Sequence, residues 1–311
     1  MKTSIIIPTY KPDKNIWNII EYSEPEKLSS DLIINVYIIE SGPKEIFINE
    51  KLFSHVKTTS IPQKEFNHGA TRNQGAKLAS QSGADVLVFM TQDAVPHDSG
   101  WLEKLVEPIR TGEAVATFAR QLPRPGASLL EQFSRDFNYP SRSRVRDRQD
   151  IPAMGVKAFF FSNVCSAVRA DVFWELGGFP DNVIMNEDMM MAAKILRAGY
   201  SIKYVAESEV VHSHDYTLKQ QFRRNFDVGA FFADAGSMLD GAAVGGEGLR
   251  FVREQVRYVL SRGRPALIPL VVAEAAVKFT AFQLGKRHRF LPLSVKKRMS
   301  MHSYHWDQHK E

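Results

Sequence analysis

The chain has 311 residues, of which 44% are hydrophobic and 24% charged. This composition is typical of a soluble globular protein with one large α/β domain and appendages, or with two domains. The single cysteine, Cys165, excludes an internal disulfide and a zinc site built from several cysteines, and it favours a reducing compartment. The formal net charge is +5, but from Arg250 onward thirteen Lys and Arg stand against four Asp and Glu. This asymmetry predicts an anionic partner for the C-terminal part of the chain.

The first 120 residues alternate between short apolar runs and stretches with a helical pattern. Strands are predicted at 4–10, 32–40, 55–61, 86–90 and 114–119, with helices at 16–22 and 101–109 and another that leads from 66–75 through Ala79. Short apolar runs bounded by turn residues are typical of strands covered on both faces. The alternation predicts a doubly wound α/β sheet flanked by helices. The apolar run near the N-terminus is too short for a secretory signal and continues directly into the first strand.

Two turns after strands carry the first candidate site residues. Pro8-Thr9-Tyr10 follows the first strand without a G-x-G-x-x-G pattern, which weighs against a nicotinamide-dependent enzyme. Thr91-Gln92-Asp93 follows the strand at 86–90, at the edge where ligands bind in open α/β sheets. A carboxylate there is a natural ligand for Mg²⁺, which fills its remaining positions with phosphate oxygens and water. Asp93 is therefore predicted to hold the metal of a nucleotide diphosphate; the alternative is that it only caps the following turn.

The middle of the chain adds an arginine-rich segment, two adjacent acids and two histidines. Residues 135–150 contain five arginines and few apolar positions, so they predict a mobile polar loop, either plain surface or a lid that grips phosphate. A strand is predicted at 159–169. Glu187-Asp188 opens a helix over 189–198, where the acids either cap the helix or serve a site. A strand from Tyr204 ends in His212 and His214, whose spacing of two places them on one face.

The C-terminal part is predicted to be helical over 218–232, 249–260 and 265–284, with a glycine-rich loop at 236–248. Glu274, Lys278 and Pro269 interrupt the apolar segment at 265–284, which argues against a membrane span. Basic clusters at 286–289 and 296–298 follow it and favour an interfacial helix on an anionic membrane surface. The alternative is that these helices pack on their own domain or on a second subunit, which leaves a homo-oligomer open. Nucleic-acid binding is disfavoured, because no recognised motif appears and the rest of the chain is net acidic.

The order of these motifs resembles glycosyltransferase family 2, the inverting enzymes with the GT-A fold, from residue 4 to about 215. The resemblance implies a nucleotide-sugar transferase domain over 1–217, with a Rossmann-like mixed sheet, and a helical basic extension over 218–311. Ile39-Glu40-Ser41-Gly42 looks like the family's second strand, which usually ends in Asp. The run 66–75 is similar to a family element that ends in Arg-Asn-x-Gly, and helix N-termini and arginines favour nucleotides. The residues then expected to bind the nucleotide are Pro8, Thr9, Tyr10, Glu40, Asn67, Gly69, Arg72 and Gln92.

The resemblance also assigns the metal site. Thr91-Gln92-Asp93 looks like the family's D-x-D element with its first Asp lost, so Asp93 corresponds to the position that binds Mg²⁺ or Mn²⁺. Several family members use a histidine after the later strand as a further metal ligand or diphosphate contact. His212 is the first choice for that role and His214 the second, with a structural histidine as the alternative.

The acceptor side follows from the same resemblance. Gly177-Gly178-Phe179 is similar to the family's G-G-F/Y turn, and an acid after that turn is the general base. This makes Asp188 the carboxylate that takes the proton of the attacking hydroxyl. Glu187, Gly178 and Phe179 are then expected on the acceptor side, with Glu187 orienting the acceptor or a neighbouring side chain.

Bacterial rhamnosyltransferases are the subset that the chain resembles most, through Phe66-Asn67-His68-Gly69, Thr91-Gln92-Asp93-Ala94 and the aromatic segment 222–232. This implies transfer of L-rhamnose from dTDP-β-L-rhamnose to a hydroxyl of a lipid-linked glycan. The product would enter a cell-surface polysaccharide such as O-antigen, capsule or cell wall. The enzyme is expected in the cytoplasm, peripheral on the inner face of the membrane. The alternatives are a UDP-hexose donor, or a non-catalytic module that binds glycans or nucleotides.

Overall fold

The computed structural model describes residues 1–24, 32–42, 53–239 and 246–308. Within these residues nine strands form one mixed sheet in the order β3-β2-β1-β4-β8-β6-β9-β5, and β7 pairs with β9 off this path. The strands are β1 Lys2–Thr9, β2 Ile33–Glu40, β3 Val56–Ser60, β4 Val86–Met90, β5 Val95–Pro96, β6 Ala116–Leu122, β7 Arg144–Arg146, β8 Cys165–Arg169 and β9 Ile202–Val211.

Two directions of pairing make the sheet mixed. Strands β1 to β4 are parallel to one another, and β6 is parallel to β9. Strand β8 lies antiparallel between β4 and β6. The predicted α/β sheet is therefore present, and three strands that run in the opposite direction, β5, β7 and β8, separate it from a purely parallel doubly wound sheet.

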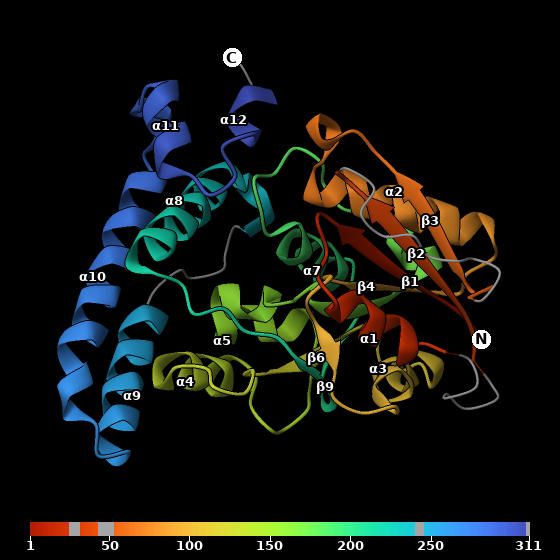
Figure 1. Cartoon of the computed structure of the whole chain (residues 1–311), viewed down its shortest axis with the longest axis horizontal. Coiled ribbons are helices and arrows are strands. Elements are labelled where there is room, and N and C mark those ends of the chain that lie inside the picture. The colour runs from red at the N-terminus through yellow and green to blue at the C-terminus, as the bar shows by residue number, and fades with distance from the viewer. Residues whose placement is uncertain (25–31, 43–52, 240–245, 309–311) are drawn as a thin grey trace.

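Helices cover both faces of the sheet, because strands buried on both sides send alternate side chains to two cores. In β1, Ile5 and Ile7 join a core with α1 (Asn15–Glu21) and α3 (Trp101–Arg110). Ile6, between them, joins a second core with α2 (His68–Gln81), α6 (Ala170–Glu175) and α7 (Glu187–Arg197). Figure 1 shows α2 and α3 on opposite sides of the sheet.

The segment 135–150 differs from the predicted mobile loop. Helix α4 (Leu129–Asn138) extends into it, β7 pairs antiparallel with β9, and α5 (Ile151–Met154) follows. Arg146 is buried, and its guanidinium donates to the backbone oxygens of Lys157 at 2.9 Å and Phe160 at 2.6 Å. The mobile-loop prediction was wrong because part of the segment forms helix and strand and Arg146 binds backbone oxygens inside the fold, which the segment's polar composition does not reveal.

The strand predicted at 159–169 is also shorter than expected. Residues Gly155–Phe159 form a 3₁₀ helix, and the strand itself begins at Cys165. The aromatic side chains of Phe159 and Phe161 are buried in the same core as α7. They reach this core from the segment before the strand, not from the sheet itself.

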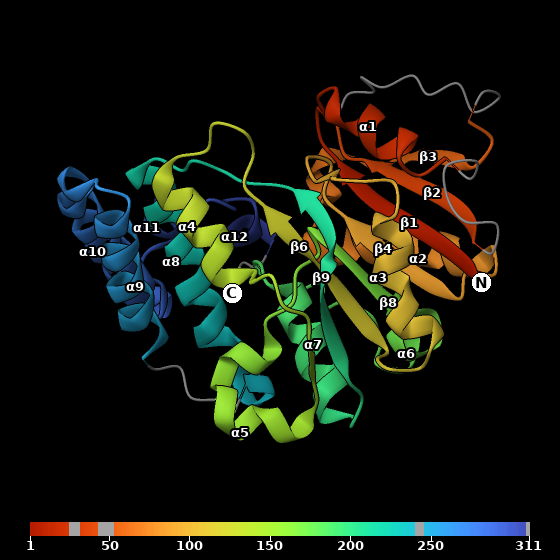
Figure 2. The ribbon, with the colours of Figure 1, turned by 90° about the horizontal axis from the view of Figure 1, so that it is seen from below.

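The C-terminal helices lie beside the sheet, at the left of Figures 1 and 2. They are α8 Leu218–Asp234, α9 Glu247–Ser261, α10 Ile268–Gly285, α11 Leu293–Met299 and α12 His305–Gln308. Phe226 and Phe231 of α8 belong to the core that contains α2 and α7. The extension expected from residue 218 thus shares its core with the sheet. Residues 240–245 of the predicted glycine-rich loop lie outside the described residues.

Helix α10, with the 3₁₀ turn before it, is long and apolar enough over Pro265–Gly285 to cross a membrane, judged by length and composition alone. Pro269 falls in the first turn of α10, where proline does not break a helix. Glu274 and Lys278 form an ion pair of 3.1 Å one turn apart. The three residues that argued against a span therefore interrupt the helix less than their sequence positions suggested.

Candidate active site

A cavity of about 350 Å³ opens where the ends of β4 and β9 meet the start of α7. Asp93 lies just after β4, and His212 and His214 lie just after β9. Asp188 lies in the first turn of α7. Asp93 and Asp188 both line this one cavity. Two acids that are far apart in the chain thus share a single cavity.

Asp93, His212 and His214 form a cluster suited to a metal ion. Their ligand atoms all lie within 4.8 Å of one another, with Asp93 Oδ2 at 3.6 Å from His212 Nε2 and 3.4 Å from His214 Nε2. Burial alone would raise the pKa of Asp93, but His212 and then His214 hold it well below its usual range. Burial lowers the pKa of His214 to about 4, so at pH 7 this imidazole is neutral and can donate a lone pair.

Gln121 fixes which nitrogen of His212 faces Asp93. Its Nε2 donates to the Tyr139 hydroxyl at 2.6 Å, and its Oε1 accepts from Arg135 Nη1 at 2.6 Å. Since arginine can only donate, the oxygen must be on that side, and His212 Nδ1 at 3.0 Å from the same oxygen must be the donor. In the neutral imidazole, His212 Nε2 then carries its lone pair toward Asp93. Such a hydrogen bond to the other ring nitrogen is a regular feature of metal-binding histidines, so the residues present fit a divalent cation.

Asp188 is positioned by backbone hydrogen bonds at the start of α7. Its Oδ2 accepts from Asn163 N at 3.1 Å and its Oδ1 from Met189 N at 2.8 Å. Burial, and then the negative charge of Glu187, raise the pKa of Asp188 to about 7. A carboxylate with its pKa near neutrality suits a group that takes up a proton during catalysis.

Glu187 is engaged by Arg72 rather than pointing freely toward a ligand. Arg72 Nη1 lies 3.0 Å from Glu187 Oε1, and the two side chains are only 5% and 7% exposed. Arg72 also donates to the backbone oxygen of His68 at 3.2 Å, while Asn163 Nδ2 donates to Glu187 at 3.2 Å. Burial alone would raise the pKa of Glu187, but Arg72 and then His68 hold it below its ordinary value. Arg72, which the sequence predicted to bind the nucleotide, is therefore the buried ion-pair partner of Glu187.

The other predicted nucleotide residues lie outside the cavity around Asp93. Pro8 and Thr9 pair in register with Ile39 and Glu40, at the carboxyl ends of β1 and β2. They are therefore held side by side at the edge where the sequence placed them, although the described residues that line the 350 Å³ cavity do not include them.

Gln92 is committed to the backbone of Tyr10. Tyr10 N donates to Gln92 Oε1 at 2.7 Å, and Gln92 Nε2 donates to Tyr10 O at 3.0 Å. The amide thus joins the segment after β4 to the end of β1. Its contribution is to hold two strand ends together, and its amide group is already satisfied by the protein.

Asn67 and Gly69 join the start of α2 to the segment at Pro180 and Asp181. The Asn67 side chain accepts from Gly69 N at 2.9 Å and Ala70 N at 3.0 Å, and its Nδ2 donates to Asp181 O at 2.8 Å. A Cβ on Gly69 would lie 2.0 Å from Pro180 O. These residues bind the start of α2 to the turn after Gly178, so they shape the site through the backbone.

Gly178 and Phe179 were expected on the acceptor side. Gly178 has φ +65, which favours glycine, and a Cβ there would lie 2.9 Å from the Asn73 amide oxygen. The Phe179 ring is buried and lies 4.8 Å from Phe89 and 5.0 Å from Phe173. The Phe179 side chain is therefore part of the core, and the turn faces α2 rather than the cavity.

Sequence reasoning missed the C-terminal wall of the cavity. Met301 and His302 line it, and their backbone N–H groups donate to Asp227 Oδ2 at 2.8 and 3.2 Å. The His302 ring lies 5.1 Å from the His68 ring at 88°. Burial lowers the pKa of His68 to about 4 and of His302 to about 3, so both are neutral at pH 7. No local motif marks these residues, because only the return of the chain after α11 brings them to the site.

The mixed sheet, the carboxylate with two histidines at its edge and the second carboxylate across the cavity define the class of protein. They match the arrangement expected for an enzyme that acts on nucleotide sugars with the GT-A fold. Residues 4–177 match the model of the family described as Glycosyl transferase family 2. The chain therefore belongs to glycosyltransferase family 2, as the sequence motifs predicted.

Relatives of known name match nearly the whole chain. It is 39% identical over 312 residues to the O-antigen chain rhamnosyltransferase RfbN of Salmonella typhimurium, covering 99% of this chain and 96% of that protein. It is 36% identical over 305 residues to the O-antigen chain rhamnosyltransferase WbaN of Salmonella anatum, covering 98% and 95%.

Solved structures confirm the GT-A fold. The mannosyltransferase PcManGT from Pyrobaculum calidifontis, in complex with GDP-Man and Mn²⁺, is similar with a TM-score of 0.53 and 15% identity, over 97% of this chain and 84% of that one. TarS of S. aureus is similar with a TM-score of 0.51 and 14% identity, over 92% and 55%.

Proposed function

We propose that this glycosyltransferase moves L-rhamnose from dTDP-β-L-rhamnose to a hydroxyl of a lipid-linked glycan during bacterial O-antigen synthesis. The observation that supports the reaction is the cavity that Asp93 and Asp188 share. The choice of sugar and pathway is supported by the two O-antigen chain rhamnosyltransferases, which are 39% and 36% identical over nearly their full lengths.

Asp188 acts as the general base in this proposal. The acceptor oxygen attacks the anomeric carbon of the donor sugar, and the bond between that carbon and the diphosphate oxygen breaks. The proton of the acceptor hydroxyl passes to an Asp188 carboxylate oxygen. Attack from the face opposite the diphosphate inverts the anomeric centre. Arg72 holds Glu187 at 3.0 Å, so Glu187 stays ionised next to Asp188 and makes it a stronger base.

Asp93, His212 and His214 would hold a divalent cation. Two imidazole nitrogens beside one carboxylate favour Mn²⁺ over Mg²⁺, since Mg²⁺ prefers oxygen ligands. When bound, such a cation offsets negative charge on the departing diphosphate. Gln121 keeps His212 in the tautomer that presents its Nε2 lone pair to this position.

The nucleotide would lie along the ends of β1 and β2. Pro8, Thr9 and Tyr10 would contact the base, and Glu40 would accept hydrogen bonds from the base or ribose. Asn67, Gly69 and Gln92 would act on nucleotide binding indirectly, because they hold α2 and the strand ends in place.

We place the enzyme in the cytoplasm on the inner face of the membrane. Val272 and Phe279, on the outer side of α10, are 56% and 66% exposed, and the basic clusters at 286–289 and 296–298 follow this helix. Exposed apolar side chains beside basic clusters favour an anionic lipid surface.

Transfer of rhamnose to octyl glycosides tests the proposal. The purified protein is incubated with dTDP-β-L-rhamnose, Mn²⁺ and octyl glycosides of galactose, glucose, mannose or N-acetylglucosamine, and dTDP release and product are measured. Chelation with EDTA should abolish transfer and added Mn²⁺ should restore it. Faster transfer from UDP-galactose or UDP-N-acetylglucosamine would replace the donor assignment, and tight donor binding without any transfer would favour a binding module.

The variant Asp188→Asn tests the base. It should lower kcat by about 10²–10⁴-fold, the range that a positioned base contributes, because an amide cannot take up the proton. Its affinity for dTDP-β-L-rhamnose, measured by calorimetry, should stay that of the wild type. Transfer at the wild-type rate would contradict the role of Asp188.

A further inference from the structure

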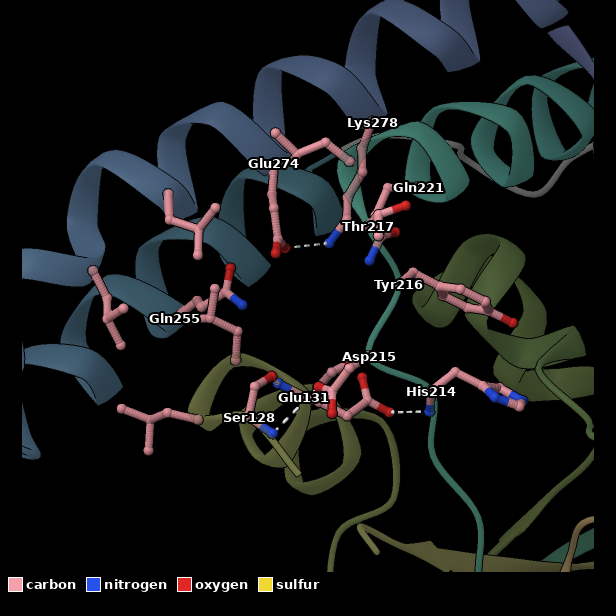
Figure 3. A pocket seen from close by; sticks show the side chains of 16 residues that line it. Ser128, Glu131, His214, Asp215, Tyr216, Thr217, Gln221, Gln255, Glu274 and Lys278 are labelled. Carbon is pink, nitrogen blue, oxygen red and sulfur yellow. Dashed lines mark hydrogen bonds and ion pairs between the residues drawn. The ribbon is translucent and has the colours of Figure 1, made fainter. Parts of the chain in front are cut away.

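A second cavity, of about 370 Å³, lies between α4, α8, α9 and α10. Figure 3 shows Glu274 and Lys278 of α10 on one side of it and Ser128 and Glu131 on the opposite side. His214 and Tyr216 line both this cavity and the one that contains Asp93 and Asp188. The rings of His214 and Tyr216 are stacked, with centroids 5.2 Å apart. The two cavities are therefore neighbours that share one wall.

The lining of this second cavity combines polar side chains with five leucines, and its charges are already paired. Glu131 binds Arg135 at 2.7 Å, Asp215 binds Arg124 at 2.9 Å, and Glu274 binds Lys278 at 3.1 Å. Three carboxylates and a single lysine line the space, which disfavours an anion such as a diphosphate. The lining suits a neutral ligand with several hydroxyl groups, because carboxylates accept and amides both donate and accept hydrogen bonds.

Gln255 of α9 contributes a buried amide to this space. It is only 2% exposed, and among the residues that the structure describes its side chain makes no hydrogen bond. The amide lines the cavity, so its donor and its acceptor are available to the hydroxyl groups of a ligand.

Helix α10 separates its polar and apolar side chains between two sides. Glu274 and Lys278 line the cavity, with side chains 13% and 28% exposed. Val272 and Phe279 are exposed and do not line it. In a helix that contacts lipid, charged residues usually face the protein interior or a water-filled cavity and mark a site. An amphiphile that reaches α10 from a lipid surface would therefore find the polar cavity directly behind that helix.

We infer that this cavity binds the neutral glycan of the acceptor, beyond the sugar whose hydroxyl is attacked. The aromatic faces of Tyr216 and His214 lie at the junction, where the glycan passes into the cavity that contains Asp188. The amides of Gln221 and Gln255 and the carboxylate of Glu274 bind its hydroxyl groups. This inference rests on the proposed function, since it assigns a site to the second substrate of that reaction.

Cysteine protection tests occupancy without requiring catalysis. The native Cys165 is buried, and burial raises the pKa of its thiol, so an introduced cysteine reacts alone with a methanethiosulfonate reagent. Ser134→Cys lies in the cavity wall, and Ser261→Cys, at the exposed end of α9, is the matched control. The probes are four octyl glycosides of disaccharides (maltose, lactose, cellobiose and melibiose) below their micellar concentrations, with octyl tetraethylene glycol as a tail without sugar. Their second sugar can lie beyond the attacked one, so they also serve as acceptors in the kinetic test.

At least one octyl glycoside should slow labelling of Ser134→Cys about tenfold and leave Ser261→Cys unchanged. Octyl tetraethylene glycol should protect neither position. Equal protection by this sugar-free tail would identify an alkyl chain as the occupant and overturn the glycan assignment. Absence of protection by all four glycosides would overturn it as well, whether or not the enzyme transfers rhamnose.

Kinetics of amide variants give the second readout. Gln221→Leu and Gln255→Leu should each raise KM for the acceptor about tenfold, the effect of one lost hydrogen bond near 1.4 kcal/mol, with kcat and the dissociation constant for dTDP-β-L-rhamnose unchanged. Gln283→Leu, on α10 but outside the cavity, is the control. Acceptor KM values within twofold of wild type would overturn the inference, and so would a parallel loss of donor affinity. If the wild type neither binds nor uses this donor, the proposed function fails. The labelling experiment still shows whether a glycan occupies the second cavity, because it does not require transfer.

Discussion

In the proposed mechanism, the buried Asp188 at the start of α7 connects catalysis to pH. The pKa of Asp188 is raised to about 7 by burial and then by Glu187, and only its deprotonated form can act as a base. We therefore expect kcat/KM to rise with pH through about 7 and to level off above it. A profile that is flat between pH 5.5 and 8.5 would contradict this expectation.

The same raised pKa predicts how stability changes with pH. Because the folded protein holds the Asp188 proton more tightly than the unfolded chain, stability from this group is present below about pH 3.8 and is lost as pH rises through 7. Asp188→Asn lacks this titration. The free energy of unfolding of the variant minus that of the wild type, both measured in urea, should therefore increase between pH 5 and 8. A difference that stays constant over this range would be evidence against a raised pKa.

Gln121 offers a test of the metal cluster that does not depend on activity. Gln121→Met keeps the side-chain volume but removes the acceptor for His212 Nδ1, so the imidazole loses its fixed tautomer. Loss of such a supporting contact typically lowers metal affinity by about 10–100-fold. Mn²⁺ binding followed by electron paramagnetic resonance should show this loss, whereas Gln132→Met, on the neighbouring helix, should bind as the wild type does.

At the scale of elements, α8 and α10 approach each other through glycines. A Cβ on Gly285 would lie 2.0 Å from Phe226 O, and one on Gly229 would lie 2.2 Å from Phe282 O. Gly285→Ala must push the two backbones apart. We expect it to lower the free energy of unfolding by about 1–3 kcal/mol, as overpacking does. Gly248→Ala, in α9 with nothing within 4 Å of the new Cβ, should be neutral or slightly stabilising. Calorimetry compares the two, and equal Tm values would show that the close helix contact is not required.

At the scale of the whole molecule, the exposed side of α10 predicts membrane binding. The protein should bind vesicles that contain anionic lipid, and binding should weaken as salt rises. Phe279→Asp should lower vesicle binding at least tenfold while transfer to a soluble octyl glycoside stays unchanged. Ile33, which is 56% exposed, lies at the start of β2, a strand far from α10 in Figure 1, and supplies the control Ile33→Asp. Unchanged binding by Phe279→Asp would favour packing of α10 on a second copy.

The sequence by itself predicted the strands that local pattern determines. Strands β1, β2 and β4 each contain an apolar run, at 5–7, 36–39 and 86–90, because these positions are buried in the sheet between helices. Asp93 and Asp188, which line one cavity, were also singled out from the sequence, since each directly follows or opens an element with a clear pattern. The family was predicted for the same reason: its motifs are local in the chain.

Only the tertiary structure decided which side chains meet. The pairing of Arg72 with Glu187, the burial of Arg146 and the return of His302 to the cavity all join segments far apart in the chain. A charged or polar side chain takes whichever partner the fold brings within hydrogen-bond distance, and burial makes that partner obligatory. Residue type and spacing therefore predicted the two acids that share the cavity, whereas the partners that set their pKa and orientation depend on contacts that form when the chain has folded.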